Sequence, residues 1–166
     1  PRCEFNGVFD EDVSIYEAIQ TVLDVGRCAL VREGTKFRAV PDSTRSVTQV
    51  FSESSILAGS LEVSEVSAVD VASEMEISYL DREFNYDRES TRVTVPGQES
   101  ASFGNEGKTT STFAVGITHS NAAQRHGSYR LLKSQYQRKN LNMEVTLEGL
   151  AAQVGDRVQI QHKDLG

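Results

Sequence analysis

The chain has no tryptophan, only two cysteines and no long apolar run, and each shortage excludes a class of protein. Two cysteines, Cys3 and Cys28, are too few for a disulfide scaffold or a cysteine-rich zinc site. Each lies in an apolar, strand-like stretch, so we predict that both are buried. No stretch approaches the roughly 20 apolar residues that cross a bilayer, and the first residues lack the pattern of a signal peptide. The sequence therefore predicts neither a disulfide-rich protein nor membrane insertion.

The length of 166 residues fits one domain with its own core, or two small lobes. A content of 38% hydrophobic and 25% charged residues is typical of a globular protein. The chain starts without methionine, directly in a strand-like pattern, so we expect it to be a segment of a longer protein. We predict a single domain over 1–166, with sub-lobes at 1–42 and 43–166 as the alternative.

The net charge of −7 argues against a general nucleic-acid binder, which would carry an excess of basic residues. The charge is unevenly distributed, because residues 53–90 hold ten acidic side chains against only Arg82 and Arg88. Residues 107–143 hold no acidic side chain; their basic residues are Lys108, Arg125, Arg130, Lys133, Arg138 and Lys139. We predict two solvated faces of opposite charge, with contact to neighbouring subunits as the alternative.

The first part of the chain predicts a β-α-β-β order. Residues 3–9 alternate apolar and polar side chains, as a strand does. The segment Ser14-Ile15-Tyr16-Glu17 has the spacing of a capping box, and Gly26 stands where a left-handed residue would end the helix. The apolar positions of this helix form one stripe: Ile15, Ala18, Ile19, Val22 and Leu23. Residues 28–31 and 36–40 then read as a hairpin around Gly34.

The rest of the chain predicts strands around one long helix. Candidate strands are 47–52, 61–66, 75–81, 91–95, 113–117, 142–147 and 157–162. Met75, Ile77 and Tyr79 alternate with polar residues, the mark of a sheet with one solvated face. Residues 97–112 are rich in Gly, Ser and Thr and predict a loop. A helix over 120–139 contains Gly127, which indicates close backbone packing or a kink. We predict an α+β fold, with two helices packed on a mainly antiparallel sheet.

One stretch resembles a phosphate-binding loop without its context. Residues 102–109 end in Gly-Lys-Thr, but Ser102 stands where that motif requires glycine. The residues before it are polar, and those after it read as a strand instead of the helix that would direct amides at phosphate. We therefore predict no nucleotide binding.

Other candidates for chemistry are equally incomplete. The candidate metal ligands are the three histidines, His119, His126 and His162. None is spaced i, i+4 from another, and no Gly-x-Ser-x-Gly elbow is present. The acid pairs Glu74/Glu76 and Asp81/Glu83 would each lie on one side of a strand, where carboxylates can act as a glycosidase pair or bind Ca²⁺. Alternating acids more often form a solvated face, so we predict no catalytic, cofactor-binding or metal-binding residue.

Short motifs in a fixed order carry a resemblance over nearly the whole chain. They are Phe5-Asn6-Gly7-Val8, the helix ending at Gly26, the hairpin ending in Pro41-Asp42, Ile56-Leu57-Ala58-Gly59, Glu76-Ile77-Ser78-Tyr79-Leu80-Asp81, Gly116-Ile117-Thr118, the helix with Ala123, Arg125, Gly127 and Tyr129, Leu147-Glu148-Gly149-Leu150 and Val154-Gly155-Asp156-Arg157-Val158. In this order the motifs resemble the domain shared by the lambda-type tail tip attachment protein J family and related phage tail proteins. The sequence departs from that pattern at Val154, where the family commonly has proline, and in the loop from Pro96 to Lys108.

The resemblance implies a fold similar to phage tail-hub domains and a place at the tail tip of a phage or prophage particle made in the bacterial cytoplasm. It also implies a homotrimer that contacts neighbouring tail tube and tip proteins, reaches the host receptor through other domains, and lets DNA pass through its channel. No cofactor and no catalytic residue carry over. The family's shared positions are structural: Phe5, Gly7, Gly59, Asp81, Gly116, Gly127, Gly155 and Asp156.

The function we predict is assembly of the tail hub and support of host attachment. The acidic strand face from Glu62 to Glu76 would line the channel and repel DNA, while the basic helix face contacts a neighbouring tail protein. The alternative is an adhesion domain that binds a host-surface carbohydrate or protein. A third interpretation is a hydrolase whose site forms only in three dimensions.

Overall fold

The computed structural model describes residues 3–10, 12–66, 72–95 and 108–165. Contacts within the chain divide it into two compact units: unit 1 is Pro1–Arg27 with Val66–Arg138, and unit 2 is Cys28–Glu65 with Lys139–Gly166. The sub-lobes 1–42 and 43–166 stay a prediction, since contact units are not necessarily the parts that fold independently. No helix in the described part of the chain is long and apolar enough to cross a bilayer.

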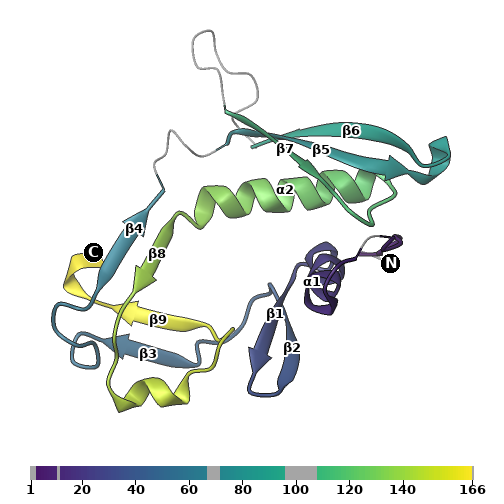
Figure 1. The fold of residues 1–166 in the computed structure, drawn as a ribbon. Coiled ribbons are helices and arrows are strands. Elements are labelled where there is room, and N and C mark those ends of the chain that lie inside the picture. The colour runs from purple at the N-terminus through teal and green to yellow at the C-terminus, as the bar shows by residue number, and fades with distance from the viewer. Residues whose placement is uncertain (1–2, 11, 67–71, 96–107, 166) are drawn as a thin grey trace, which may run out of the picture. The chain divides into compact units, whose positions relative to one another are not determined.

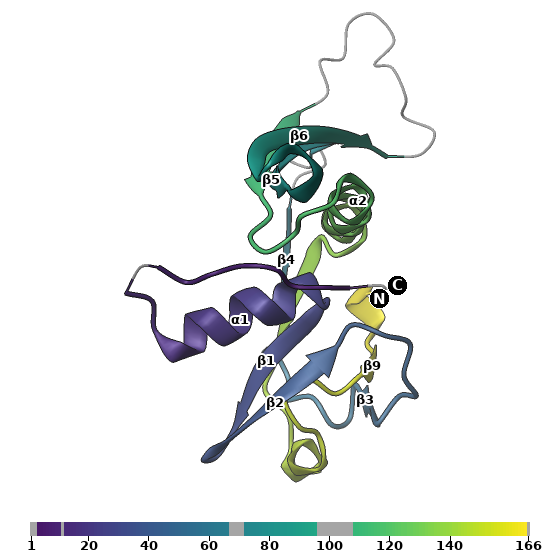
Figure 2. The same cartoon turned by 90° about the vertical axis from the view of Figure 1, so that its right-hand side faces the viewer.

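Unit 1 contains a three-stranded sheet covered on one face by a helix (Figures 1 and 2). The strands, in sheet order, are β6 (Asp87–Thr94), β5 (Glu74–Asp81) and β7 (Thr109–Phe113). β5 runs antiparallel to β6 and parallel to β7. The covering helix is α2 (Ser120–Tyr136), and the short helix η2 (Arg82–Phe84) links β5 to β6.

The core of unit 1 lies between this sheet and α2. Met75, Ile77 and Tyr79 of β5 are buried there with Leu131 of α2, while the intervening residues of β5 are more accessible. The alternation predicted for this strand is therefore confirmed. The helix packs tightly on the sheet at Gly127, where an added Cβ would lie 2.0 Å from Ile77 Cδ1. This contact confirms the predicted close packing.

The helix α1 (Ile15–Val25) of unit 1 begins as its sequence predicts. Ser14 Oγ accepts a hydrogen bond from Glu17 N at 3.2 Å, and the Glu17 carboxylate accepts one from Ser14 N at 3.1 Å. These two bonds form the predicted capping box. The predicted left-handed end at Gly26 is wrong, because Gly26 has φ −79° and the left-handed residue is Arg27, with φ +56°.

Unit 2 consists of strand pairs and short helices. The pairs are the antiparallel hairpin β1 (Cys28–Glu33) with β2 (Lys36–Pro41), the parallel β3 (Gln49–Ser52) with β9 (Val158–Gln161), and the antiparallel β4 (Glu62–Glu65) with β8 (Lys139–Asn142). The short helices are η3 (Leu147–Ala151) and η4 (Lys163–Leu165). Two helices with mainly antiparallel pairs confirm the predicted α+β class.

Side-chain hydrogen bonds in unit 2 stabilise the turn that precedes β9. Arg38 Nη2 donates to the Val154 carbonyl at 3.0 Å. Gly155 follows with φ +91° and packs against Val40, while Asp156 accepts a hydrogen bond from Gln153 N. The Gly-Asp turn therefore forms with valine in front of it, because glycine supplies the left-handed backbone and aspartate the hydrogen bond.

Several predicted elements are wrong. Residues 3–9 form no strand; a single backbone hydrogen bond joins Asn6 N to the Gly116 carbonyl, and only Phe5 packs against the core. The predicted loop 97–112 includes β7, because threonines suit a half-buried strand; residues 97–107 lie outside the described ones. The strand predicted at 113–117 ends at Phe113.

The helix and cysteine predictions also need correction. α2 ends at Tyr136 instead of residue 139, and the next residues form β8, three positions before the predicted strand 142–147. Cys3 is exposed and Cys28 only half-buried, so neither is the buried residue that we predicted. Cys3 lies in the extended N-terminal segment, and Cys28 is the first residue of β1.

Candidate functional site

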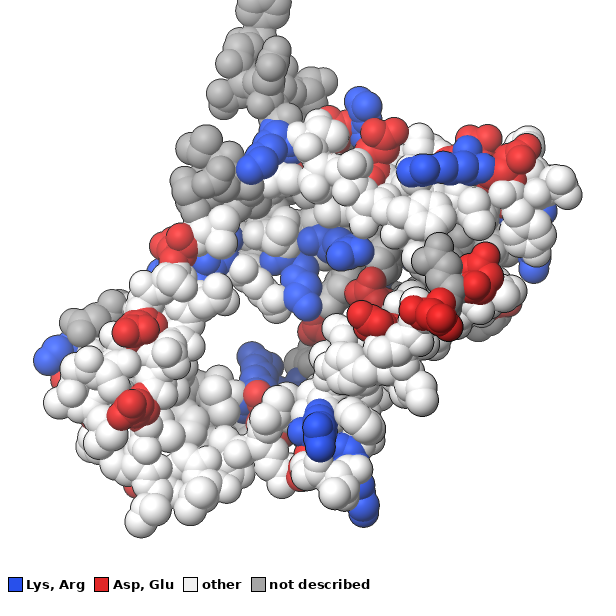
Figure 3. Space-filling model, in the orientation of Figure 1, with Lys and Arg blue, Asp and Glu red and all other residues white. Residues whose placement is uncertain are grey.

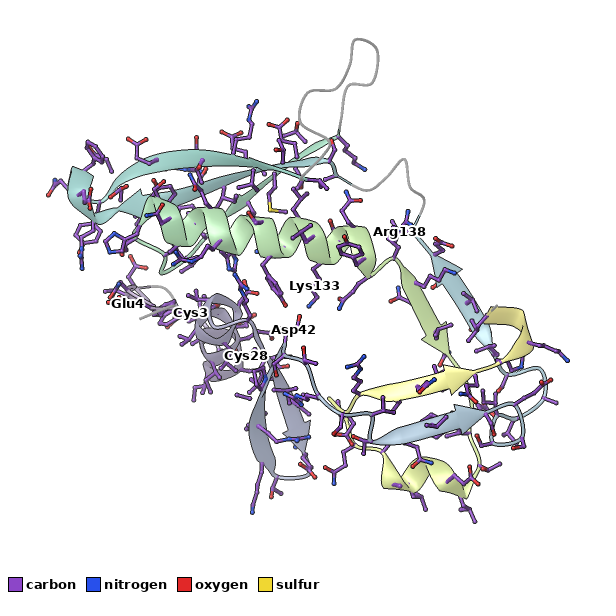
Figure 4. All side chains as sticks on the ribbon, turned by 180° about the vertical axis from the view of Figure 1, so that it is seen from behind. Cys3, Glu4, Cys28, Asp42, Lys133 and Arg138 are labelled. Atoms are coloured by element: carbon purple, nitrogen blue, oxygen red, sulfur yellow. The ribbon has the colours of Figure 1, made fainter. Side chains whose placement is uncertain are left out.

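A basic surface of unit 1 covers the side of α2 that faces away from the sheet. Arg125, Tyr129 and Lys133 follow one another at i, i+4 and i+8 and so share a helix face. Lys and Arg side chains gather over α2 in Figure 3, and Figure 4 shows Lys133 projecting from the helix on the side opposite the sheet. We call Arg27, Arg125, Arg130 and Lys133 the α2 basic face; Arg130 lies at its border with the sheet, where Arg130 Nη1 donates to Thr112 Oγ1 of β7 at 3.4 Å.

Tyr129 holds two cations of this face. The Arg27 guanidinium lies 4.6 Å from the centre of the Tyr129 ring, and Lys133 Nζ lies 5.8 Å from it. Arg27 Nη2 also donates to the Arg125 carbonyl at 3.1 Å. Arg27 follows α1 and has a left-handed backbone, with φ +56°, and its guanidinium lies over the Tyr129 ring. Cation–ring attraction therefore restrains the Arg27 and Lys133 side chains against the Tyr129 ring.

Asp24, near the end of α1, lies close to Arg130 and His126 of α2. Its Oδ2 is 3.7 Å from Arg130 Nη1 and 3.6 Å from His126 Nε2. The carboxylate is about half exposed, so its ion pair with Arg130 stabilises the unit only modestly. These contacts tie the end of α1 to α2. Asp24 offsets one positive charge, so the four cations of the basic face still outnumber the acid beside them.

His126 is buried beneath this face, with 5% of its surface exposed. Its Nδ1 has no hydrogen-bond partner among the described residues. It lines a cavity of about 20 Å³, together with Cys3, Glu4, Val25, Arg27, Ile117, Ala122 and Arg125. A volume of this size holds about one water molecule and is too small for a metabolite. The cavity can therefore hydrate the buried imidazole, and it offers no room for a substrate.

The environment of His126 makes the stability of the fold depend on pH. Burial lowers the pKa of His126 from its usual 6.5; Asp24 opposes the change, and Arg130 and Arg27 reinforce it. Above pH 6.5 both folded and unfolded chains carry this histidine neutral. Below it the unfolded chain binds the proton first, so we expect the free energy of unfolding to fall as the pH decreases from about 6.5. Urea unfolding between about pH 5 and 8 measures this slope.

A glutamine at this position separates His126 from the other titrating groups. His126→Gln cannot take up the proton, so its unfolding free energy should depend less on pH than that of the wild type. His119→Gln is the matched control, because His119 lies outside the core at the start of α2. An unchanged slope in His126→Gln would contradict the assignment.

The residues singled out for chemistry do not converge. In the described part of the chain, no three His, Cys, Asp or Glu side chains are placed to hold a metal ion. Glu74 and Glu76 lie on the same side of β5, and Glu74 pairs with Arg92 at 2.9 Å. The prediction that Asp81 and Glu83 lie on one side of a strand is wrong, because Asp81 is buried at the end of β5 and Glu83 belongs to η2.

Two further sequence features, the stretch that resembles a phosphate-binding loop and the acidic segment, do not form a site in the described residues either. Thr109 starts β7 instead of a helix, as the sequence predicted; residues 102–107 lie outside the described part. The acidic segment is divided, since Glu62 and Glu65 belong to β4 of unit 2 and Glu74 and Glu76 to unit 1.

Several large apolar side chains of unit 1 are exposed, among them members of the stripe predicted for α1. Ile15 of α1 is 81% exposed, and Ile19 and Val22 of the same stripe are each 39% exposed. At the turn between β5 and β6, Phe84 and Tyr86 are also exposed, and Tyr86 has φ +63°. An amphipathic sequence pattern signals a buried face but does not say whether the same chain or a partner buries it.

Comparisons with known proteins identify a family from the sequence and a similar fold from the structure. A model of the family described as "Putative phage tail protein" matches residues 14–166. A comparison with curated proteins finds no match. The chain is similar to a solved structure from the "Virion of native gene transfer agent (GTA) particle", with a TM-score of 0.67 and 14% identity. The similarity covers 88% of this chain and 33% of that one, so the chain spans about a third of the neighbour's length. At this identity the likeness concerns the fold alone.

Proposed function

Because the chain belongs to the phage tail protein family, we propose that it is a non-enzymatic structural module of the tail tip, part of the hub that supports host attachment. In the intact parent protein it works as a homotrimer next to tail tube and tip proteins, and other domains reach the host receptor. The family match over residues 14–166 carries this proposal.

The apolar stripe of α1 supports a role in assembly. Ile15, Ile19 and Val22 form one side of a helix with a complete capping box, yet they remain accessible. Monomeric proteins seldom expose contiguous apolar surface, and such surface often marks contact with another protein. A subunit that reaches its final environment only in a particle has this property.

The acidic side chains of β4 and the α2 basic face suggest different contacts, the first with DNA and the second with neighbouring tail proteins. Glu62 and Glu65 of β4 are exposed, and acids that face the channel would repel phosphate, so that DNA slides without binding. The α2 basic face would then contact an acidic surface of a neighbouring tail protein. Location of Glu62 and Glu65 on the outside of the assembled tip would contradict this arrangement.

Immuno-electron microscopy of particles tests the location. Antibodies raised against the purified chain should place gold at the distal end of the tail. Labelling along the tube would contradict the tip assignment, and intact particles without the protein would contradict a structural role altogether.

The turn between β5 and β6 favours adhesion as a second candidate function. Phe84 and Tyr86 expose aromatic rings on a backbone that is fixed by a hydrogen bond from Tyr86 N to the Asp81 carbonyl at 2.7 Å. Exposed aromatic rings suit binding of a sugar or a protein. The purified chain should then bind host cells, and Phe84→Ser with Tyr86→Ser should abolish binding. Failure of the wild-type chain to bind would exclude this candidate.

A further inference from the structure

His126 is buried at the joint between two parts of unit 1. One part is the three-stranded sheet with α2. The other part consists of residues 3–10 and 12–27, which include α1, and we call it the α1 cover. The cavity beside His126 has walls from both parts: Cys3, Glu4, Val25 and Arg27 from the α1 cover, and Ile117, Ala122 and Arg125 from α2 or the segment just before it. The α1 cover therefore contributes to the burial of His126, and its departure would open the imidazole to water.

The surroundings of His126 disfavour a proton on its ring. The titratable and charged groups beside it are Cys3, Glu4, Asp24 and Arg27 from the α1 cover, and Arg125 and Arg130 from α2. Three of these groups are cations and two are carboxylates, and His126 Nδ1 has no hydrogen-bond partner among the described residues. A buried charge without a partner is costly. Protonation therefore favours a state in which His126 lies in water.

The α1 cover has few anchors on the rest of unit 1. Val25 is the one side chain of α1 that is buried, and most of the apolar stripe of this helix is exposed. Ahead of α1, Phe5 packs against the core, and Asn6 N donates to the Gly116 carbonyl at 2.8 Å. The core between the sheet and α2 contains most of the buried apolar side chains of unit 1. Parts with few buried apolar contacts open at a lower free energy than the core, so the α1 cover should open first.

We propose that the α1 cover is a pH-sensitive device, which leaves α2 at mildly acidic pH when His126 takes up a proton, while the sheet and α2 stay folded. After release, His126 lies in water in the open and in the unfolded chain alike, so its protonation no longer destabilises the remaining core. Release takes Arg27 away from the Tyr129 ring and Asp24 away from Arg130, which uncovers this side of α2. This behaviour belongs to the chain alone and does not depend on the proposed function.

Amide hydrogen exchange of the purified chain at about pH 7.5 and about pH 5 tests the release. Each rate is compared with that of an unstructured peptide at the same pH, which removes the intrinsic effect of pH on exchange. A helix of 11 residues is marginal in water by itself, so a released α1 loses the protection of its amides.

We expect the amides of α1 to be less protected than those of β5 at both pH values, and to lose at least ~5-fold of their protection at about pH 5. The limit is ~30-fold, which applies if buried His126 stays neutral throughout this range. A smaller loss would overturn the proposal. Equal protection of α1 and β5 would overturn it as well, because α1 would then open only when the whole unit unfolds.

A variant without the titrating group assigns the release to His126. In His126→Gln the protection of α1 should change by less than ~2-fold between the two pH values, since glutamine takes up no proton. His119→Gln, altered at the start of α2, is the control and should keep the loss seen in the wild type. The wild-type loss in His126→Gln would contradict the role of His126.

A titration of the wild type decides if His126→Gln does not fold. The imidazole of His126, followed by NMR, should take up its proton below the usual pH of 6.5. A midpoint at 6.5 would overturn the proposal, because a histidine with the same pKa in the closed and open states cannot drive release.

Discussion

Gly127→Ala is expected to lower the free energy of unfolding by about 2 kcal/mol, because it forces a methyl group into a packed core. The new Cβ would lie 2.0 Å from Ile77 Cδ1 and 2.7 Å from Ile77 Cγ1. Ile77 is fully buried, so its side chain cannot move into solvent. The better helix propensity of alanine, about 1 kcal/mol, offsets only part of this cost. Urea unfolding monitored by circular dichroism measures the change.

A double substitution identifies the clash as the cause. Ile77→Val removes Cδ1, so Gly127→Ala should cost about 1 kcal/mol less in that background than in the wild type. Asn121→Ala, at an exposed position of the same helix, is the control and should change stability by less than about 0.5 kcal/mol. An equal cost of Gly127→Ala in both backgrounds would contradict the steric explanation.

Asp81→Ala is expected to cost about 2 kcal/mol, because it leaves the buried Tyr79 phenol and the partly buried Glu83 amide without this acceptor. The Asp81 side chain is 6% exposed, and its carboxylate accepts hydrogen bonds from Glu83 N at 2.8 Å and from Tyr79 Oη at 3.2 Å. The first bond starts η2 and shapes the turn that follows β5. Thermal and urea unfolding should both show the loss.

The residue paired opposite Asp81 provides a matched control. Asp87 stands across from Asp81 in the β5–β6 register but is exposed, so Asp87→Ala should cost less than about 0.5 kcal/mol. Tyr79→Phe removes only the phenol donor and should cost about 1 kcal/mol. Similar losses for Asp81→Ala and Asp87→Ala would show that burial of the carboxylate is not the cause.

Where one local rule determines an element, the sequence predicts it well. The spacing of Ser14 and Glu17 leads directly to the capping box, and the alternation of Met75, Ile77 and Tyr79 to the buried face of β5. Gly127 indicates close packing because glycine is unfavourable in a helix without a steric reason. Membership of the phage tail protein family, expected from the order of motifs, is confirmed by the family match. Identity with the tip attachment protein stays a prediction.

Elements that depend on distant partners could not be predicted from a local pattern. The alternation in residues 3–9 is real, but no neighbouring strand meets it, so an extended segment with one long-range backbone hydrogen bond results. β7 has few large apolar residues, and its pairing comes from β5, far earlier in the chain. Strand formation there is a property of the sheet more than of the segment.

Only part of the α2 basic face could be predicted from the sequence. The absence of acids from 107–143 and the helical spacing of Arg125, Tyr129 and Lys133 predict a basic face. The position of Arg27 over Tyr129 depends on a left-handed backbone at a residue that rarely adopts it, and nothing in the local sequence marks it. His126 is surrounded by Asp24 and Val25 at the end of α1 and by Cys3 and Glu4 of the N-terminal segment, so residues far from it in the chain contribute to its burial.

The division of each unit into two chain segments has a consequence for synthesis. β3 pairs with β9 and β4 with β8, so both strands must wait for residues made near the end of this chain. Unit 1 needs nothing beyond Arg138 and can close on the ribosome while unit 2 still lacks β8 and β9. Pairings over such long sequence separations form slowly. Emergence of the segment from Lys139 onward is therefore the step that commits the nascent chain to its final form.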